Sequence, residues 1–327
     1  MQNPNVTVKG TDEVLVPKKE RLIKMYAEIN RMSKREQANL LLWRVFAKFT
    51  SNFLKTGKEE ANAIYKNVFD NQGHNTPRSE NCINQIKTFF PNIVDDLTIS
   101  NYLEPDDKGS ILNMFNQIKE EFRDVITESE WMQESTKSEA IQKLNKLKIN
   151  VGEINNNVEH SAAVLALIST DKYLNNIRIL GNSFWKRMVG RLRATKDAFT
   201  NEAEDNAYYW AMFNQVQINV GLMKGSGIGY SHDLPRALMY GGFTSSTLGH
   251  ELTHGFDNRG SDFDGHGIER NWWDDKSKEE FEKRTECMVD QYNNFVFSID
   301  GKNYTTNGQN TIGENIADNG GVKIGYR

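Results

Sequence analysis

The segment His250-Glu251-Leu252-Thr253-His254 contains the residue types of a catalytic zinc site at the spacing that such a site needs. On a helix, residues four positions apart lie on the same face, so the imidazoles of His250 and His254 can bind one Zn²⁺. Glu251 follows the first histidine and would act as general base on a water molecule beside the metal. The alternative is an exposed helix with a coincidental histidine pair, although the chain has only 6 histidines.

A catalytic zinc site also needs a third protein ligand and an open position for water. The metzincin pattern is excluded, because Asp257 and Gly260 stand where its glycine and its third histidine would be. The later segment Gly313 to Gly321 offers Glu314 and Asp318, four residues apart on one face of a predicted helix. We expect Glu314 to bind the metal and Asp318 to accept a hydrogen bond from a ligand histidine, which fixes its tautomer. Taken alone, the two carboxylates would also suit an exposed acidic helix face.

The composition is that of a soluble globular protein, with 38% hydrophobic and 26% charged residues in a chain of 327. A net charge of −4 and scattered basic residues give no reason to expect a nucleic acid as partner. No apolar run approaches the ~18 residues that cross a bilayer, and Met1 to Gly10 does not read as a signal peptide. The two cysteines, Cys82 and Cys287, can pair with each other or stay reduced.

The first part of the chain has the apolar periodicity of helices. Apolar residues recur at three- and four-residue steps in Arg21 to Met32, in Gln37 to Phe53 and in Asp106 to Leu147. The last of these stretches is interrupted at residues 127–130, where a capping region before a second helix is predicted. We therefore expect residues 1–205 to form a helical lobe.

The pattern changes from about Asn206 onward. Residues 215–220 alternate polar and apolar side chains, which predicts a short strand. Residues 244–247 are serines and threonines, which predict the N-cap of the helix that carries the histidines. Trp272 and Trp273 are predicted to open a further helix that runs towards Phe295.

Several motifs in a fixed order resemble the neprilysin and endothelin-converting-enzyme family of zinc metallopeptidases. They are Gly-His-Glu-Leu-Thr-His-Gly-Phe-Asp at 249–257, Asn-Trp-Trp at 271–273 and Gly-Glu-Asn-Ile-Ala-Asp-Asn-Gly-Gly at 313–321. Upstream of these, Asn-Ala-Tyr-Tyr at 206–209 is similar to the strand with which the family holds the substrate backbone. Such a series is far more specific than any one of its members.

The resemblance implies a mainly α (α+β), two-lobed fold, with the helical lobe followed by a thermolysin-like zinc peptidase lobe at 206–327 that contains a small sheet. It implies one Zn²⁺ per chain and an endopeptidase that hydrolyses oligopeptides. Asn206, Ala207 and Tyr208 would bind the substrate, and Glu251 and Asp318 would serve catalysis. A catalytically impaired fragment and a zinc-retaining, peptide-binding protein are the alternatives.

The resemblance also suggests where the protein works. Relatives are anchored by an N-terminal transmembrane helix or secreted, so we expect a membrane-anchored full-length form at the extracellular face of the plasma membrane, or a secreted one. The chain reads as a fragment without the anchor region and the C-terminal end, which in relatives supplies further catalytic residues. We therefore expect the isolated chain to be poorly active. Relatives also bond the cysteines equivalent to Cys82 and Cys287 to partners in segments that this chain lacks.

Overall fold

The computed structural model describes residues 19–53, 77–153, 162–191, 201–225, 230–231 and 234–327. The chain divides into two compact units: unit 1 is Met1–Phe89 with Leu180–Arg193, and unit 2 is Phe90–Ile179 with Ala194–Arg327. All residues of the predicted metal site belong to unit 2. The boundary expected near residue 205 lies within unit 2, so the division into a helical and a catalytic lobe stays a prediction.

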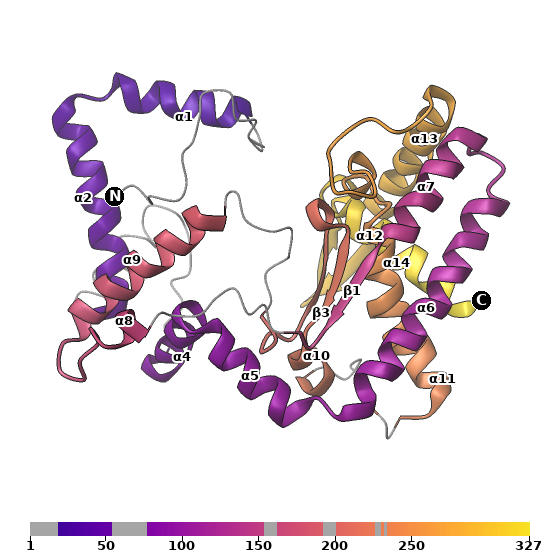
Figure 1. Ribbon diagram of the computed structural model, residues 1–327. Helices are drawn as coiled ribbons and strands as arrows, with labels where there is room; N and C mark the ends of the chain where they lie inside the picture. The colour runs from indigo at the N-terminus through magenta and orange to yellow at the C-terminus, as the bar shows by residue number, and fades with distance from the viewer. Residues whose placement is uncertain (1–18, 54–76, 154–161, 192–200, 226–229, 232–233) are drawn as a thin grey trace. The chain divides into compact units, whose positions relative to one another are not determined.

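The described part of unit 1 consists of helices (Figure 1). They are α1 (Lys19–Arg31), α2 (Lys34–Phe53), α4 (Arg78–Phe89) and most of α9 (Tyr173–Arg191). Ser33 and Glu36 form a reciprocal cap at the start of α2, because the Ser33 N–H donates to Glu36 (2.7 Å) and the Glu36 N–H donates to the Ser33 hydroxyl (3.3 Å). The helices predicted in this part of the chain are confirmed, with starts that differ by two or three residues.

Unit 2 is also mainly helical, as expected from the sequence (Figure 1). It contains two small sheets, whereas the sequence predicted one. Its helices are α5 (Pro91–Tyr102), α6 (Pro105–Glu128), α7 (Glu134–Lys146), α8 (Ala162–Leu165), η2 (Ala211–Phe213), α10 (Val220–Gly225), α11 (Arg236–Leu238), η3 (Met239–Gly249), α12 (His250–His254), η4 (Gly260–Asp262), α13 (Asp275–Asn293) and α14 (Gly308–Tyr326). Among the helices of the described residues, none is both long enough and apolar enough to span a bilayer.

Helices α6 and α7 supply much of the core of unit 2. Pro105 opens α6, and the Glu104 N–H donates to Asp107 (2.9 Å) in a capping box. The predicted apolar stripe of α6 is buried, with Ile111 and Phe115 almost fully enclosed. The predicted interruption is present as well, because α6 ends at Glu128 and α7 begins six residues later.

The larger sheet has the strand order β1-β3-β2, formed by β1 (Lys148–Val151), β3 (Gln215–Ile218) and β2 (Ala207–Trp210). Strand β1 runs parallel to β3, whereas β2 is antiparallel to it. Val216 and Ile218 are completely buried and turn one face of the sheet towards the core. The strand predicted at 215–220 is therefore confirmed, although the chain already enters α10 at Val220. Strand β2 lies at the edge.

The helix that carries the histidines starts differently from the prediction. Residues 244–247 are not an N-cap, because they lie within the π-helix η3, which continues directly into α12. The hydroxyls of Ser245 and Ser246 donate to carbonyls of the preceding turn, those of Tyr240 (3.1 Å) and Gly242 (2.6 Å). Such back-bonding to the helix itself is the usual alternative to capping for serine inside a helix.

Helix α13 differs from the prediction at both its start and its end. Asp274, rather than a tryptophan, caps this helix by accepting the Ser277 N–H (2.9 Å). Trp273 precedes the helix and donates its indole N–H to the Ser261 carbonyl (3.1 Å). The helix ends at Asn293, two residues before the predicted Phe295, and the chain then forms an unpredicted hairpin of β4 (Val296–Ile299) and β5 (Lys302–Thr305). Both cysteines are free and exposed.

Candidate metal centre

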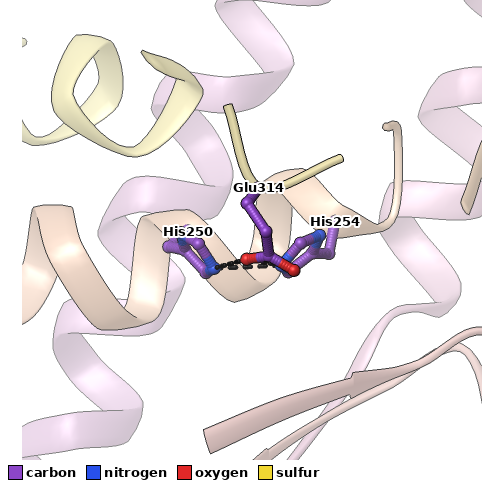
Figure 2. A group of neighbouring side chains, drawn as sticks. All are labelled: His250, His254 and Glu314. Carbon is purple, nitrogen blue, oxygen red and sulfur yellow. Dashed lines mark hydrogen bonds and ion pairs between the residues drawn. The ribbon is translucent and has the colours of Figure 1, made fainter. Parts of the chain in front are cut away.

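The metal-ligand candidates lie on two helices that pack against each other. Helix α12 places His250 and His254 one turn apart, and α14 brings Glu314 opposite them, so the three side chains point towards one another (Figure 2). The two Nε2 atoms are 2.9 Å apart, and Glu314 Oε2 lies 3.3 Å from that of His250 and 3.4 Å from that of His254. Asn307 starts α14 by accepting the Asn310 N–H (3.0 Å), which sets where Glu314 falls on the helix.

This set of donor atoms fits a zinc ion. With zinc–ligand bonds of 2.0–2.1 Å, two ligands of one tetrahedral ion are about 3.3 Å apart, close to the three separations found between these atoms. Both imidazoles engage a carboxylate through Nδ1, so their Nε2 atoms are left as lone-pair donors that face each other. Two such nitrogens repel each other at 2.9 Å unless a cation or a proton lies between them.

Each histidine has its own carboxylate partner. His250 Nδ1 lies 2.8 Å from Asp318 Oδ1 on α14, the arrangement that the sequence predicts for Asp318. His254 Nδ1 lies 2.7 Å from Asp257 Oδ2, a contact that the sequence interpretation missed. The available signal was position, because Asp257 follows His254 by three residues and α-helical spacing brings such residues to one face. Asp257 is 5% exposed, and the carboxylate of Asp318 is exposed.

The general-base candidate Glu251 is 7% exposed, on the side of α12 that contacts β2. Burial raises the pKa of Glu251 to about 7, and the charges of Glu314 and Asp257 act in the same direction. The charge of His254 opposes this shift. A bound cation would lower this pKa and favour the carboxylate, the form in which Glu251 can accept a proton.

Comparison with known sequences matches both parts of the chain to models of one family, described as Peptidase family M13, at residues 1–153 and 206–327. Human neprilysin is 30% identical over 335 residues, an alignment that covers all of this chain and 44% of neprilysin. The chain belongs to peptidase family M13. Human endothelin-converting enzyme 1 is 29% identical, with 98% of this chain and 42% of that enzyme covered. This M13 chain thus spans less than half the length of these relatives.

Solved structures agree with the M13 assignment. Zinc metalloprotease ZMP1 of Mycobacterium tuberculosis, in complex with an inhibitor, has a TM-score of 0.73 at 25% identity, covering 86% of this chain and 43% of that one. PepO from Lactobacillus rhamnosis has a TM-score of 0.70 at 23% identity, covering 86% and 44%, and shows the fold alone. The structural likeness includes most of the M13 chain and is not confined to the motif region.

The predicted substrate-binding residues of the M13 chain lie at the start of the edge strand β2. Asn206 is exposed and its Oδ1 accepts the N–H of Ala207 (2.9 Å). Ala207 is buried and pairs with Ile218 of β3. Tyr208 is half-buried and donates its hydroxyl to Glu204 (2.6 Å). The strand contacts α12, so these residues start the sheet edge that lies next to the histidines and Glu251.

Proposed function

We propose that this chain carries the active site of a zinc-dependent metalloendopeptidase that binds one Zn²⁺ through His250, His254 and Glu314. The observation that supports this proposal most is the convergence of these three donor atoms within 4.8 Å of one another, from helices more than fifty residues apart in sequence. Three protein ligands leave one coordination position open, which distinguishes a catalytic from a structural zinc site. Membership in family M13 supports the same function.

The mechanism assigns one task to each residue near the metal. When bound, zinc supplies Lewis acidity, which makes water a better nucleophile near neutral pH and polarises a peptide carbonyl. Glu251 takes the proton from the attacking water and passes it to the leaving amine. Asp318 and Asp257 hold the Nδ1–H of the two histidines, so that each Nε2 stays unprotonated and oriented.

We propose that an oligopeptide substrate binds along β2 as an added strand. Strand β2 pairs with β3 on one side only among the described residues, so its other edge can offer backbone hydrogen bonds to an extended peptide. Asn206, Ala207 and Tyr208 form the start of this edge. The Tyr209 backbone lies close enough to Glu251 to lower the pKa of its carboxyl group, so the proposed general base lies beside the strand.

The second candidate is a peptide-binding protein that retains zinc without hydrolysing its ligand, or a catalytically impaired fragment. The observation that favours this candidate is that the chain aligns with only 44% of the length of neprilysin. By family resemblance we also propose that the full-length protein is anchored at the extracellular face of the plasma membrane or secreted. An assay of a quenched peptide library separates hydrolysis from binding alone.

Zinc content and peptide hydrolysis test the proposal together. Glu314→Ala and a His250→Ala, His254→Ala double variant are expected to lose the single zinc, because two or fewer protein ligands remain. Glu251→Gln is expected to keep the zinc and to lose peptide hydrolysis. In the unchanged protein, a chelator is expected to abolish hydrolysis as well. Glu286→Ala, an exposed glutamate on α13, is the matched control and should change neither property. Full zinc occupancy in Glu314→Ala would contradict the ligand assignment, and zinc without hydrolysis in the unchanged chain would favour the peptide-binding alternative.

A further inference from the structure

A lysine lies in the core of unit 2, beside the loop that follows the histidine helix. Lys143 on α7 is 1% exposed, although lysine is among the residue types least often buried. Its amino group donates to the carbonyls of Gly260 (2.7 Å) and Phe263 (2.6 Å). Three aromatic rings surround the nitrogen, with centroids at 5.4 Å for Phe256 and 5.9 Å for Tyr209 and Trp272.

Both hydrogen bonds of the Lys143 amino group go to the loop that follows α12. Burial lowers the pKa of Lys143 to about 7, and the negative charge of Asp257 acts in the opposite direction. Both protonation states keep N–H donors, so the two bonds to the carbonyls persist on either side of that pH. Removing these donors would take the lysine hydrogen bond from the Phe263 carbonyl and leave the Gly260 carbonyl with only the Phe263 N–H (3.0 Å), in a region from which water is excluded.

The same loop also holds Asp257. Asp257 Oδ1 accepts the N–H groups of Arg259 (2.7 Å) and Gly260 (2.6 Å), and the Asp257 carbonyl accepts the N–H of Ser261 (2.9 Å). Gly260 is thus held from two sides, by Asp257 at its N–H and by Lys143 at its C=O. The backbone is tightly packed at Gly260, because a Cβ on this residue would lie 1.9 Å from the His254 carbonyl oxygen.

The end of the loop is tied to the same turn of α7. Asn214 donates its amide to the carbonyl of Lys143 (3.0 Å) and to that of Gly265 (3.2 Å). The Lys143 residue therefore fixes the loop at its middle through the side chain and at its end through the backbone. The other ligand histidine, His250, is oriented by Asp318 on α14, a contact in which Lys143 takes no part.

We infer that Lys143 is a positioning residue for the metal centre: it fixes the loop that directs Asp257 at His254, and thereby directs His254 Nε2 at the metal. The metal part of this inference rests on the proposed function. The part that concerns the Asp257–His254 contact does not rest on the proposed function, because this contact can be measured in metal-free protein. Lys143→Met tests the inference, since methionine has a similar volume and lacks the donors.

The first measurement is nitrogen-15 NMR of the histidine rings in metal-free protein, with His250 as an internal control. In Lys143→Met the protected Nδ1–H signal of His254 is expected to exchange with water at least about tenfold faster, while that of His250 is unchanged. Lys146→Met is the matched control, because Lys146 lies on the same helix and contacts the same loop at His266 (2.7 Å), away from the carbonyls. An unchanged His254 signal in Lys143→Met, or equal changes in both histidines, overturns the inference.

The second measurement is zinc affinity by competition with a chelator. Lys143→Met is expected to bind zinc about 10- to 100-fold more weakly, the range for lost outer-shell partners, while Lys146→Met binds as the unchanged protein does. Equal affinity in Lys143→Met would contradict the inference. If the unchanged protein binds no zinc, the proposed function fails and the NMR comparison still decides the role of Lys143. If Lys143→Met does not fold, Lys143→Gln, which retains a donor for one carbonyl, serves in both measurements with the same expected direction.

Discussion

The two ligand histidines are held by carboxylates in different surroundings. Asp257 is buried and also accepts two backbone N–H groups, whereas the carboxylate of Asp318 is 64% exposed. Water screens and competes for the exposed hydrogen bond more than for the buried one. His254 is therefore held more firmly than His250. In His254, burial lowers the pKa, but the hydrogen bond to Asp257 and the negative charges of Glu251, Asp257 and Glu314 together outweigh it, so the pKa is raised.

This difference leads to a prediction about zinc affinity. Asp257→Asn is expected to weaken zinc binding by about 100-fold and Asp318→Asn by about 10-fold, the two ends of the range for outer-shell partners. The two replacements are matched in chemistry, and chelator competition measures both. A larger loss for Asp318→Asn would show that burial does not set the strength of these contacts.

At the residue scale, the sequence was informative where spacing is local. His250, His254 and Glu314 could be proposed because one helical turn, or one short motif, fixes which side chains share a face. The contact of Asp257 with His254 was missed although the two residues are three positions apart, because the sequence interpretation considered Asp257 as a departure from the metzincin pattern and not as a partner of His254. Lys143 could not be found at all, because it meets the loop from more than a hundred residues away in sequence.

Helix α14 packs so closely against the junction of η3 and α12 that the backbones touch at glycines. A Cβ on Gly321 would lie 2.3 Å from the Ser245 carbonyl oxygen and 2.9 Å from the His250 nitrogen. A Cβ on Gly249 would lie 2.9 Å from the Cα of Gly321. This contact sets the distance between the helices, and so the reach of Glu314 to the histidines.

Gly321→Ala is therefore predicted to move α14 away from α12. The added methyl meets backbone rather than a flexible side chain, so we expect a loss of about 1–3 kcal/mol in the free energy of unfolding and weaker zinc binding. Gly241→Ala is the control within η3, because nothing lies within 4 Å of its Cβ position and alanine there should be neutral or slightly stabilising. Denaturant titrations and zinc competition measure both effects, and an equally tolerated Gly321→Ala would refute the close contact.

At the element scale, patterns that repeat along one helix or strand were predicted correctly, as in α6 and β3. The hairpin β4–β5 was missed although its signal was present. Asp300 and Gly301 have φ of +50° and +74°, the left-handed pair of a two-residue hairpin turn, and Asp-Gly is a strong sequence indicator of that turn. The π-helix was not predictable in the same way, because no side-chain pattern distinguishes it from the α-helix that it continues.

A buried acid connects several parts of unit 2 around the start of β2. Glu202 is completely buried and accepts hydrogen bonds from the Gln217 amide (2.9 Å) and the Val220 N–H (3.0 Å). Its own N–H donates to Asp95 on α5 (2.8 Å). Burial raises the pKa of Glu202 to about 7, and the charge of Asp95 adds to the shift while the bond from Val220 opposes it.

The stability of the whole molecule should therefore fall as the pH rises from about 4.5 to 7. In this window the native carboxyl binds a proton that the unfolded chain, in which glutamate has its ordinary pKa of 4.5, has already released. The stabilisation is complete below the unfolded pKa and is lost as the pH rises through the folded one. At about 1.4 kcal/mol per pKa unit, the contribution of Glu202 is roughly 3 kcal/mol.

Comparing the protein with Glu202→Gln in denaturant titrations at pH 5 and pH 8 isolates this contribution. The amide can still accept from Val220, and its NH₂ can donate to Gln217 Oε1, which has no hydrogen-bond partner among the described residues. The variant is expected to show a smaller decline in stability between the two pH values. Parallel declines in both proteins would show that Glu202 titrates at its ordinary pKa.

At the scale of the whole molecule, composition and periodicity predicted the mainly α class but not the compact units. Unit 2 joins residues 90–179 to the segment that carries the metal site. The units could not be predicted because they depend on contacts between segments distant in sequence. Examples are the pairing of β1 with β3 and the contact of Lys143 with the loop after α12. Such contacts leave no local periodicity by which a boundary near residue 205 could have been judged.

The separation of Glu314 from the two histidines in sequence has a further consequence for folding. A metal held by all three would act as a removable cross-link, closing a loop of roughly 60 residues that includes α13 and the hairpin. Because the three ligands come together only in the folded chain, zinc binding stabilises the fold by mass action, by about 4 kcal/mol at a free zinc concentration about a thousandfold above its Kd. A chelator would therefore do more than stop the reaction: it would remove this stabilisation and free the loop from its cross-link.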